Sequence, residues 1–142
     1  MNPLEVAFPG LAGSGYAVTS PVTLDYNCLG WAAGENDRWW WPDSAGVSYW
    51  PARVSREETL PTFVAAYATM GFAPTANPDL DPNVDKVAIY ARSGIPTHAA
   101  RQLPNGRWTS KLGQAEDIEH ALTDLVGMIY GDVAVILVRS KV

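Results

Sequence analysis

The sequence predicts an α+β domain in which two helices precede a set of mostly antiparallel strands. Apolar residues at helical spacing occur in the first half of the chain, alternating strand patterns occur in the second half, and an Asn-Gly pair marks a turn between two of these strands. With 142 residues, 47% of them hydrophobic, the chain can bury one real core, so we expect a single domain over residues 1–142.

The first helix is expected near the only cysteine, after an extended arm. Residues 1–23 are rich in glycine, proline and serine, which predicts an arm lying across the domain, with one short strand near residues 16–19. From Asn27 the sequence favours a short helix, with Asn27 as its N-cap and Gly34 as its end. Cys28 then lies in the first helical turn.

An aromatic loop and a second helix follow. Residues 35–54, ENDRWWWPDSAGVSYWPARV, contain two Trp-Pro steps that disfavour helix, so we expect an ordered loop held by aromatic packing. The segment TLPTFVAAYATMGF has apolar residues at helical spacing and predicts a second helix, capped by Thr59 and ended by Gly71.

The second half predicts a sheet of about four to five strands. DKVAIYARSG, residues 85–94, alternates as a strand, and residues 96–103 and 107–113 form a hairpin whose Asn105-Gly106 pair supplies the positive φ angles of a tight turn. A short turn or helix is expected over residues 120–127. DVAVILVRS, residues 132–140, ends the chain as an apolar strand at or next to the centre of the sheet.

Composition excludes several classes of function. The formal charge is −5 and no lysine or arginine cluster exceeds two residues, which argues against nucleic acid as a partner. The N-terminus has no basic region and no apolar run long enough for a signal peptide or a membrane span, so a cytoplasmic protein is expected. One cysteine and two distant histidines match no disulfide or zinc site, and we expect no metal and no cofactor.

Cys28 is the candidate nucleophile. A thiolate is the attacking species in cysteine hydrolases, and both a first-turn position and a nearby histidine lower a thiol pKa. Backbone N–H groups there, helped by Tyr26 or Asn27, could hold the oxyanion of a tetrahedral intermediate.

The base and its orienting group must come from the second half of the chain. His98 ranks first as the base because it lies at the start of a predicted strand, and His120 lies in a less regular stretch. Glu116, Asp117, Ser110 and His120 could each orient the imidazole; of these we expect Asp117, with His120 as a further catalytic candidate.

The element order and the Cys/His pair resemble the papain-like fold in its compact bacterial form, as in the NlpC-type and CHAP amidases and peptidases. The segments DYNCLGWAAG, PTHAARQLPNGRWTSKLG and DIEH also look similar to those of a family of small bacterial proteins of unknown function, over about residues 24–139. The papain-like resemblance implies Cys28 as nucleophile and His98 as base. At the third position the sequence WTSKLG departs from the usual Asn, Asp, Glu or His, so Asp117 or His120 replaces that residue or the triad is incomplete.

These observations predict a thiol hydrolase that cuts an amide or isopeptide bond through an acyl-enzyme on Cys28. The candidate substrate-binding residues are aromatic or precede the thiol: Tyr26, Asn27, Trp31, Trp40 and Trp41. One alternative is a non-catalytic binding protein that uses the tryptophan-rich loop, residues 39–50, to hold a protein partner; another is an acyltransferase with the same Cys/His pair. The basic residues Arg101, Arg107 and Lys111 are expected on a solvated strand surface, where they could also accept an acidic substrate group.

Overall fold

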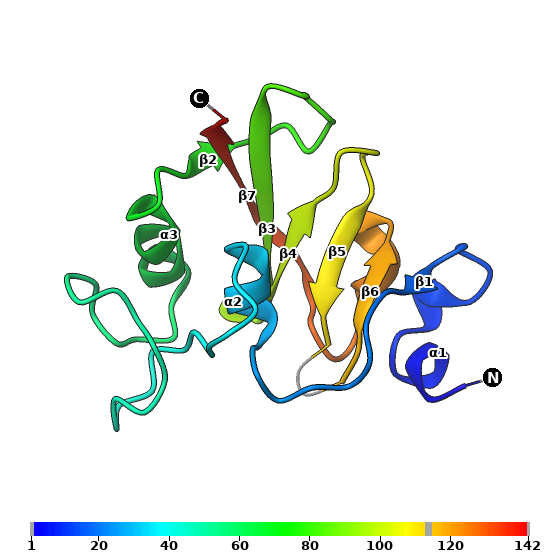
Figure 1. Cartoon of the computed structure of the whole chain (residues 1–142), viewed down its shortest axis with the longest axis horizontal. Coiled ribbons are helices and arrows are strands. Elements are labelled where there is room, and N and C mark those ends of the chain that lie inside the picture. Colours follow the sequence, from blue (N-terminus) through cyan, green and yellow to red (C-terminus); the bar gives the residue numbers. More distant parts are fainter. Residues whose placement is uncertain (1, 113–114, 142) are drawn as a thin grey trace.

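The computed structural model describes residues 2–112 and 115–141 and has an α+β architecture (Figure 1). Within these residues the strands form one seven-stranded antiparallel sheet in the order β1-β6-β5-β4-β3-β7-β2. The strands are β1 (Ala17–Val18), β2 (Ala73–Thr75), β3 (Val84–Arg92), β4 (Ile95–Gln102), β5 (Trp108–Lys111), β6 (Asp117–His120) and β7 (Asp132–Ser140). The helices are α1 (Pro3–Ala7), α2 (Cys28–Ala32), α3 (Leu60–Ala68) and the 3-10 turns η1 (Pro9–Leu11) and η2 (Leu122–Leu125).

The two predicted helices are confirmed, together with their caps. The Asn27 side chain accepts a hydrogen bond from the Gly30 N–H, 3.2 Å away, at the start of α2. Thr59 caps α3 in the same way, and each helix is followed by a left-handed glycine, Gly34 and Gly71. The longest described helix, α3, has nine residues, and no described helix could cross a bilayer.

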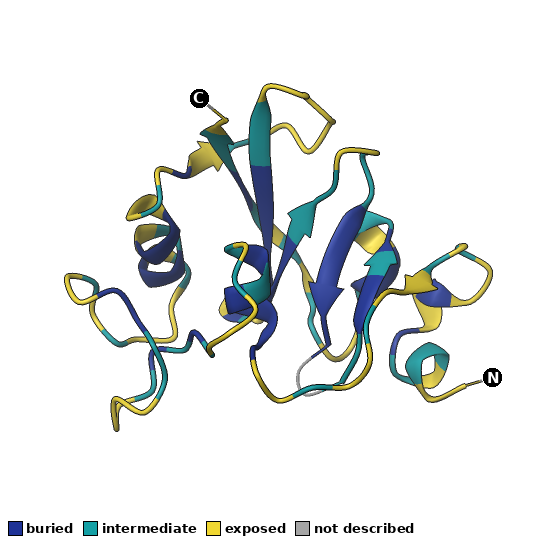
Figure 2. Cartoon of the chain, viewed as in Figure 1, coloured by how far each residue is buried: buried dark blue, intermediate teal, exposed yellow. Residues whose placement is uncertain are grey.

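The sheet carries a hydrophobic cluster on each face. Alternate residues of a strand point to opposite faces, so Ile89 and Ala99 belong to one cluster while Tyr90 and Ala100 belong to the other. Helices α2 and α3 and the tryptophan-rich loop cover the first face, and the N-terminal segment with η2 covers the second. The central strands are accordingly the most buried part of the chain (Figure 2).

Three predictions from the sequence need correction. The sheet has more strands than the expected four to five, partly because residues 117–120 form β6 and pair with both β5 and β1. The N-terminal arm is not simply extended, since it forms α1 and η1 before β1. Strand β7 lies one place from the edge of the sheet, between β3 and β2, and is neither central nor next to the centre.

The predicted hairpin of β4 and β5 is present with its loop at residues 104–106, but only one of the two expected positive φ angles occurs. Gly106 has a φ of 86°, whereas Asn105 is not among the described residues with positive φ. The Leu103 N–H donates to the Arg107 carbonyl oxygen, 2.7 Å away, and closes a loop of three residues. Gly113, the last residue of the predicted hairpin, lies outside the described residues.

Candidate functional site around Cys28

Cys28 lines an open pocket together with two tryptophans. It is the first residue of α2, and its side chain packs in the cluster that contains Ala99 of β4. The pocket has a volume of about 380 Å³ and is lined by Asn27, Cys28, Trp39, Trp41 and Ser48. Although Cys28 is only 7% exposed, its thiol is thus next to a space that can admit an apolar group.

The thiol is protonated at neutral pH. Burial raises the pKa of Cys28 to about 11, against the opposing effect of the Ala99 backbone N–H, which stabilises the thiolate. The positive charge of Lys111 also lowers this pKa, by less. The expectation that a helix start and a histidine would bring the thiol pKa down is therefore corrected: the burial of the sulfur dominates.

His98 belongs to a buried chain of three polar side chains. His98 Nε2 lies 2.9 Å from Ser110 Oγ, and Ser110 Oγ lies 2.7 Å from His120 Nε2. All three residues are fully buried, and the His98 ring stacks on the Tyr130 ring at a centroid distance of 4.0 Å. The group that contacts His98 is therefore Ser110 of β5, with His120 behind it.

The hydrogen bonds fix which nitrogens carry protons. His120 Nδ1 lies 2.7 Å from the Ala121 carbonyl oxygen, which can only accept, so Nδ1 is the protonated nitrogen. Burial lowers the pKa of both histidines, so each ring is neutral at pH 7. The Ser110 hydroxyl must then donate to His120 Nε2 and accept from His98 Nε2–H. His98 Nδ1 is left as a buried lone pair without a hydrogen-bond partner among the described residues.

No hydrogen bond joins Cys28 and His98 within the described residues, because His98 Nδ1 has no partner. The two side chains also belong to different surroundings: Cys28 packs with Ala99, and His98 faces Tyr90 and Tyr130 of the other cluster. A register shift between Tyr90 and Ala91 in β3 lies directly beside His98. The Cys28 sulfur meets the backbone N–H of Ala99. Because Ala99 and His98 are neighbours along β4, their side chains point to opposite faces of the sheet, and the thiol and the imidazole lie on opposite faces as well.

Asp117 does not orient His98, which corrects the sequence-based choice. Its carboxylate accepts a hydrogen bond from the Tyr26 hydroxyl, and in the strand register it pairs with Lys111. Asp117 and Ser110 lie on opposite faces of the sheet because Ser110 is the neighbour of Lys111 along β5. The acidic residue therefore belongs to the Cys28 face, and Ser110 belongs to the His98 face.

Only two of the five predicted substrate-binding residues line the Cys28 pocket. Trp41 and Asn27 line the Cys28 pocket, whereas Trp40 is 1% exposed and stacks on Tyr67 in the core. The hydroxyl of Tyr26 is occupied by Asp117, and Trp31 Nε1 donates to Thr109 Oγ1 at 2.9 Å. Through these contacts Tyr26 and Trp31 attach α2 and the residues before it to strands β6 and β5.

Two pocket residues, Trp39 and Ser48, were missed by the sequence reasoning. The repeated tryptophans were a signal, but three adjacent tryptophans give no indication of which one faces the pocket. Trp39 is held in place because its Nε1 donates to the Leu24 carbonyl oxygen, 2.6 Å away. One wall of the pocket is therefore fixed by a hydrogen bond.

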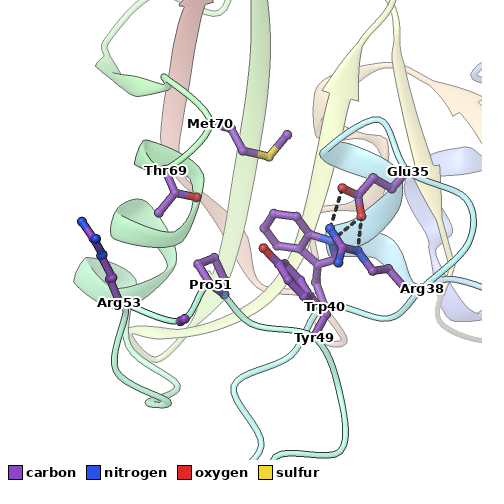
Figure 3. A pocket seen from close by; sticks show the side chains of 9 residues that line it. Glu35, Arg38, Trp40, Tyr49, Pro51, Arg53, Thr69 and Met70 are labelled. Carbon is purple, nitrogen blue, oxygen red and sulfur yellow. Dashed lines mark hydrogen bonds and ion pairs between the residues drawn. The ribbon is translucent and has the colours of Figure 1, made fainter.

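A second hollow of about 400 Å³ lies where the tryptophan-rich loop meets α3 (Figure 3). The Glu35 carboxylate accepts two hydrogen bonds from Arg38 and one from Trp40 Nε1. The Arg38 guanidinium lies 3.5 Å above the Tyr49 ring centroid. This ion pair and ring contact hold the loop that also forms the Cys28 pocket.

No group of three or more His, Cys, Asp or Glu side chains in the described ranges, 2–112 and 115–141, could hold a metal ion.

Comparison with known proteins gives one family. The family model described as a domain of unknown function, DUF7689, matches residues 17–138, which include all the residues of the site. Neither the curated proteins nor the solved structures gave a match.

Proposed function

We propose that this chain, which belongs to the DUF7689 family, is a thiol hydrolase of papain-like type that cleaves an amide or isopeptide bond through an acyl-enzyme on Cys28. The observation that carries the proposal is that Cys28, the only cysteine of the sequence, lines an open pocket together with Trp39 and Trp41.

In this mechanism His98 is the base. As Sγ attacks the substrate carbonyl carbon, the thiol proton moves to His98 Nδ1, which is the unprotonated nitrogen of a neutral ring. His98 then gives this proton to the leaving amine as the C–N bond breaks, and later removes a proton from the water that hydrolyses the thioester. Ser110 and His120 support this role because their hydrogen bonds keep the proton on Nε2.

Cys28 and His98 lie on opposite faces of the sheet in this structure, so the proton transfer requires β4 to rearrange at residues 98 and 99 and bring Nδ1 to the sulfur. Hydrogen bonds in catalytic pairs are often formed only when substrate is bound. The starting state has a neutral thiol and a neutral imidazole that are not in contact, so proton transfer and attack are coupled, in contrast to enzymes with a preformed ion pair. This difference predicts a pH–rate profile that still rises above pH 8.

Two other functions use the same features. An acyltransferase would pass the acyl group from Cys28 to an amine instead of water. A binding protein would use residues 39–50, but Trp40 and Trp50 are buried, so only the half-buried rings of Trp39, Trp41 and Tyr49 remain for that role.

Release of p-nitroaniline from p-nitroanilides with apolar acyl groups tests the proposal. We expect turnover by the wild type that Cys28→Ala reduces to the uncatalysed rate, and that Ser110→Ala reduces by at least about tenfold because the tautomer of His98 is no longer fixed. Amide product formed with an added primary amine would identify the acyltransferase. Equal rates for wild type and Cys28→Ala would refute both.

A further inference from the structure

Lys111 is a buried lysine whose position is unusual. It lies on β5, is 0% exposed, and its ammonium donates to the Ala115 carbonyl oxygen. The other buried lysine, Lys86, donates to two carbonyl oxygens, those of Asn77 and Asp79, each 2.6 Å away. Lysine is rarely buried to this extent because an ammonium loses its hydration, so a buried lysine beside a reactive group suggests a functional role.

The surroundings of Lys111 connect it to the thiol. Its Nζ lies 5.5 Å from the centroid of the Tyr26 ring, and Tyr26 precedes Cys28 by two residues. The Tyr26 hydroxyl donates to Asp117 Oδ2, and Asp117 is the cross-strand partner of Lys111. Asp117 Oδ1 is buried without a hydrogen-bond partner among the described residues. An ammonium, a phenol and a carboxylate thus lie together on the Cys28 face of the sheet.

Titratable groups from several elements surround the cluster of Lys111, Tyr26 and Asp117. Burial raises the pKa of Tyr26, of Tyr67 on α3 and of Tyr130, so these phenols are neutral at neutral pH. Burial lowers the pKa of Lys111, and the nearby charges of Asp117 and Glu116 oppose this effect. Arg101 of β4 also interacts with Asp117. Lys111 lowers the pKa of Cys28.

We infer that Lys111 is a positioning residue for the reaction at Cys28: its ammonium stabilises the negative charge that sulfur takes on as its proton leaves, and Asp117 with Tyr26 holds that ammonium in place. The inference rests on the proposed function, since it assigns the cluster to the same thiol. It gives the thiol a cation on its own face of the sheet, opposite to the face that carries His98.

The test is the rate of Cys28 alkylation by iodoacetamide between pH 7 and 11. In Lys111→Met the profile should move to higher pH, and the rate at pH 8 should fall by about tenfold for each unit by which the thiol pKa rises. Lys111→Arg keeps the charge and should restore most of the rate. Lys86→Met, the matched control, should leave the profile unchanged because Lys86 contacts carbonyl oxygens of a distant loop.

A second variant covers the case in which Lys111→Met does not fold. Lys111→Gln removes the charge but keeps a donor for the Ala115 carbonyl oxygen, and it should move the profile to higher pH in the same direction as Lys111→Met. An unchanged profile in a folded variant that lacks the charge, Lys111→Met or Lys111→Gln, would overturn the inference. Amide turnover that depends on Cys28 but not on Lys111 would refute the role of Lys111 alone, whereas absence of turnover in the wild type would refute the proposed function.

Discussion

Acidification below pH 6.5 is expected to destabilise this protein steeply. Burial lowers the pKa of His98 well below 6.5 and also lowers that of His120, so the folded state keeps both rings neutral where the unfolded chain takes up protons. This stability is therefore fully present above the unfolded pKa and is lost as the pH falls towards the folded values. Each histidine contributes a slope of up to about 1.4 kcal/mol per pH unit.

Between pH 7.5 and pH 5 the free energy of unfolding should fall by about 2 kcal/mol because of His98, and by up to the same amount because of His120. Urea unfolding at a series of pH values measures it. The chain has two histidines, so this window reports on them with little contribution from carboxylates. His98→Gln and His120→Gln should each make the pH dependence shallower, whatever they do to the absolute stability. A free energy of unfolding that stays constant down to pH 5 would contradict the conclusion that His98 and His120 are buried in their neutral forms.

Asn27→Ala is expected to lower the free energy of unfolding by on the order of 3 kcal/mol. The Asn27 side chain caps α2 and also links it to the tryptophan-rich loop. Its Oδ1 accepts from the N–H groups of Gly30 and Trp40, and its Nδ2 donates to the Trp40 carbonyl oxygen at 2.7 Å. Alanine would therefore remove a cap and leave two buried backbone groups of Trp40 unpaired.

Asn2→Ala is the matched control, because Asn2 caps α1 through the Glu5 N–H at an exposed site. It should cost only about 1 kcal/mol. Asn27→Asp keeps the acceptor and loses the donor, so its cost should lie between that of Asn27→Ala and zero. Urea denaturation gives all three values, and equal costs for Asn27→Ala and Asn2→Ala would mean that the link to Trp40 has no energetic weight.

The helices were predictable from the sequence because their signals are local. Asn27 and Thr59 are cap residues, and Gly34 and Gly71 adopt the left-handed conformation that ends a helix. Strand β6 has only four residues, and DIEH alternates too weakly to be recognised. Its strand conformation depends on pairing with β5, which is equally short, and with β1, which is distant in the sequence.

The candidate site was harder to predict because strand register decides it. A shift of one residue in the pairing of β5 with β6 would exchange the faces of Ser110 and Lys111, and with them the partner of His98. From the sequence alone Asp117 was the better hydrogen-bonding group for an imidazole, and Lys111 looked like a solvated residue. The actual register buries Lys111 beside Asp117 and gives Ser110 to His98.

The most direct test of the central claim is the mass of the protein after brief reaction with p-nitrophenyl acetate and an acid quench. The proposed mechanism predicts an acetyl group on the peptide that contains Cys28 in the wild type, none in Cys28→Ala, and formation at least about tenfold slower in His98→Gln. Acetylation of Cys28 at the same rate in His98→Gln, or an acetyl group only on other residues, would contradict the assignment of Cys28 as the nucleophile and His98 as its base.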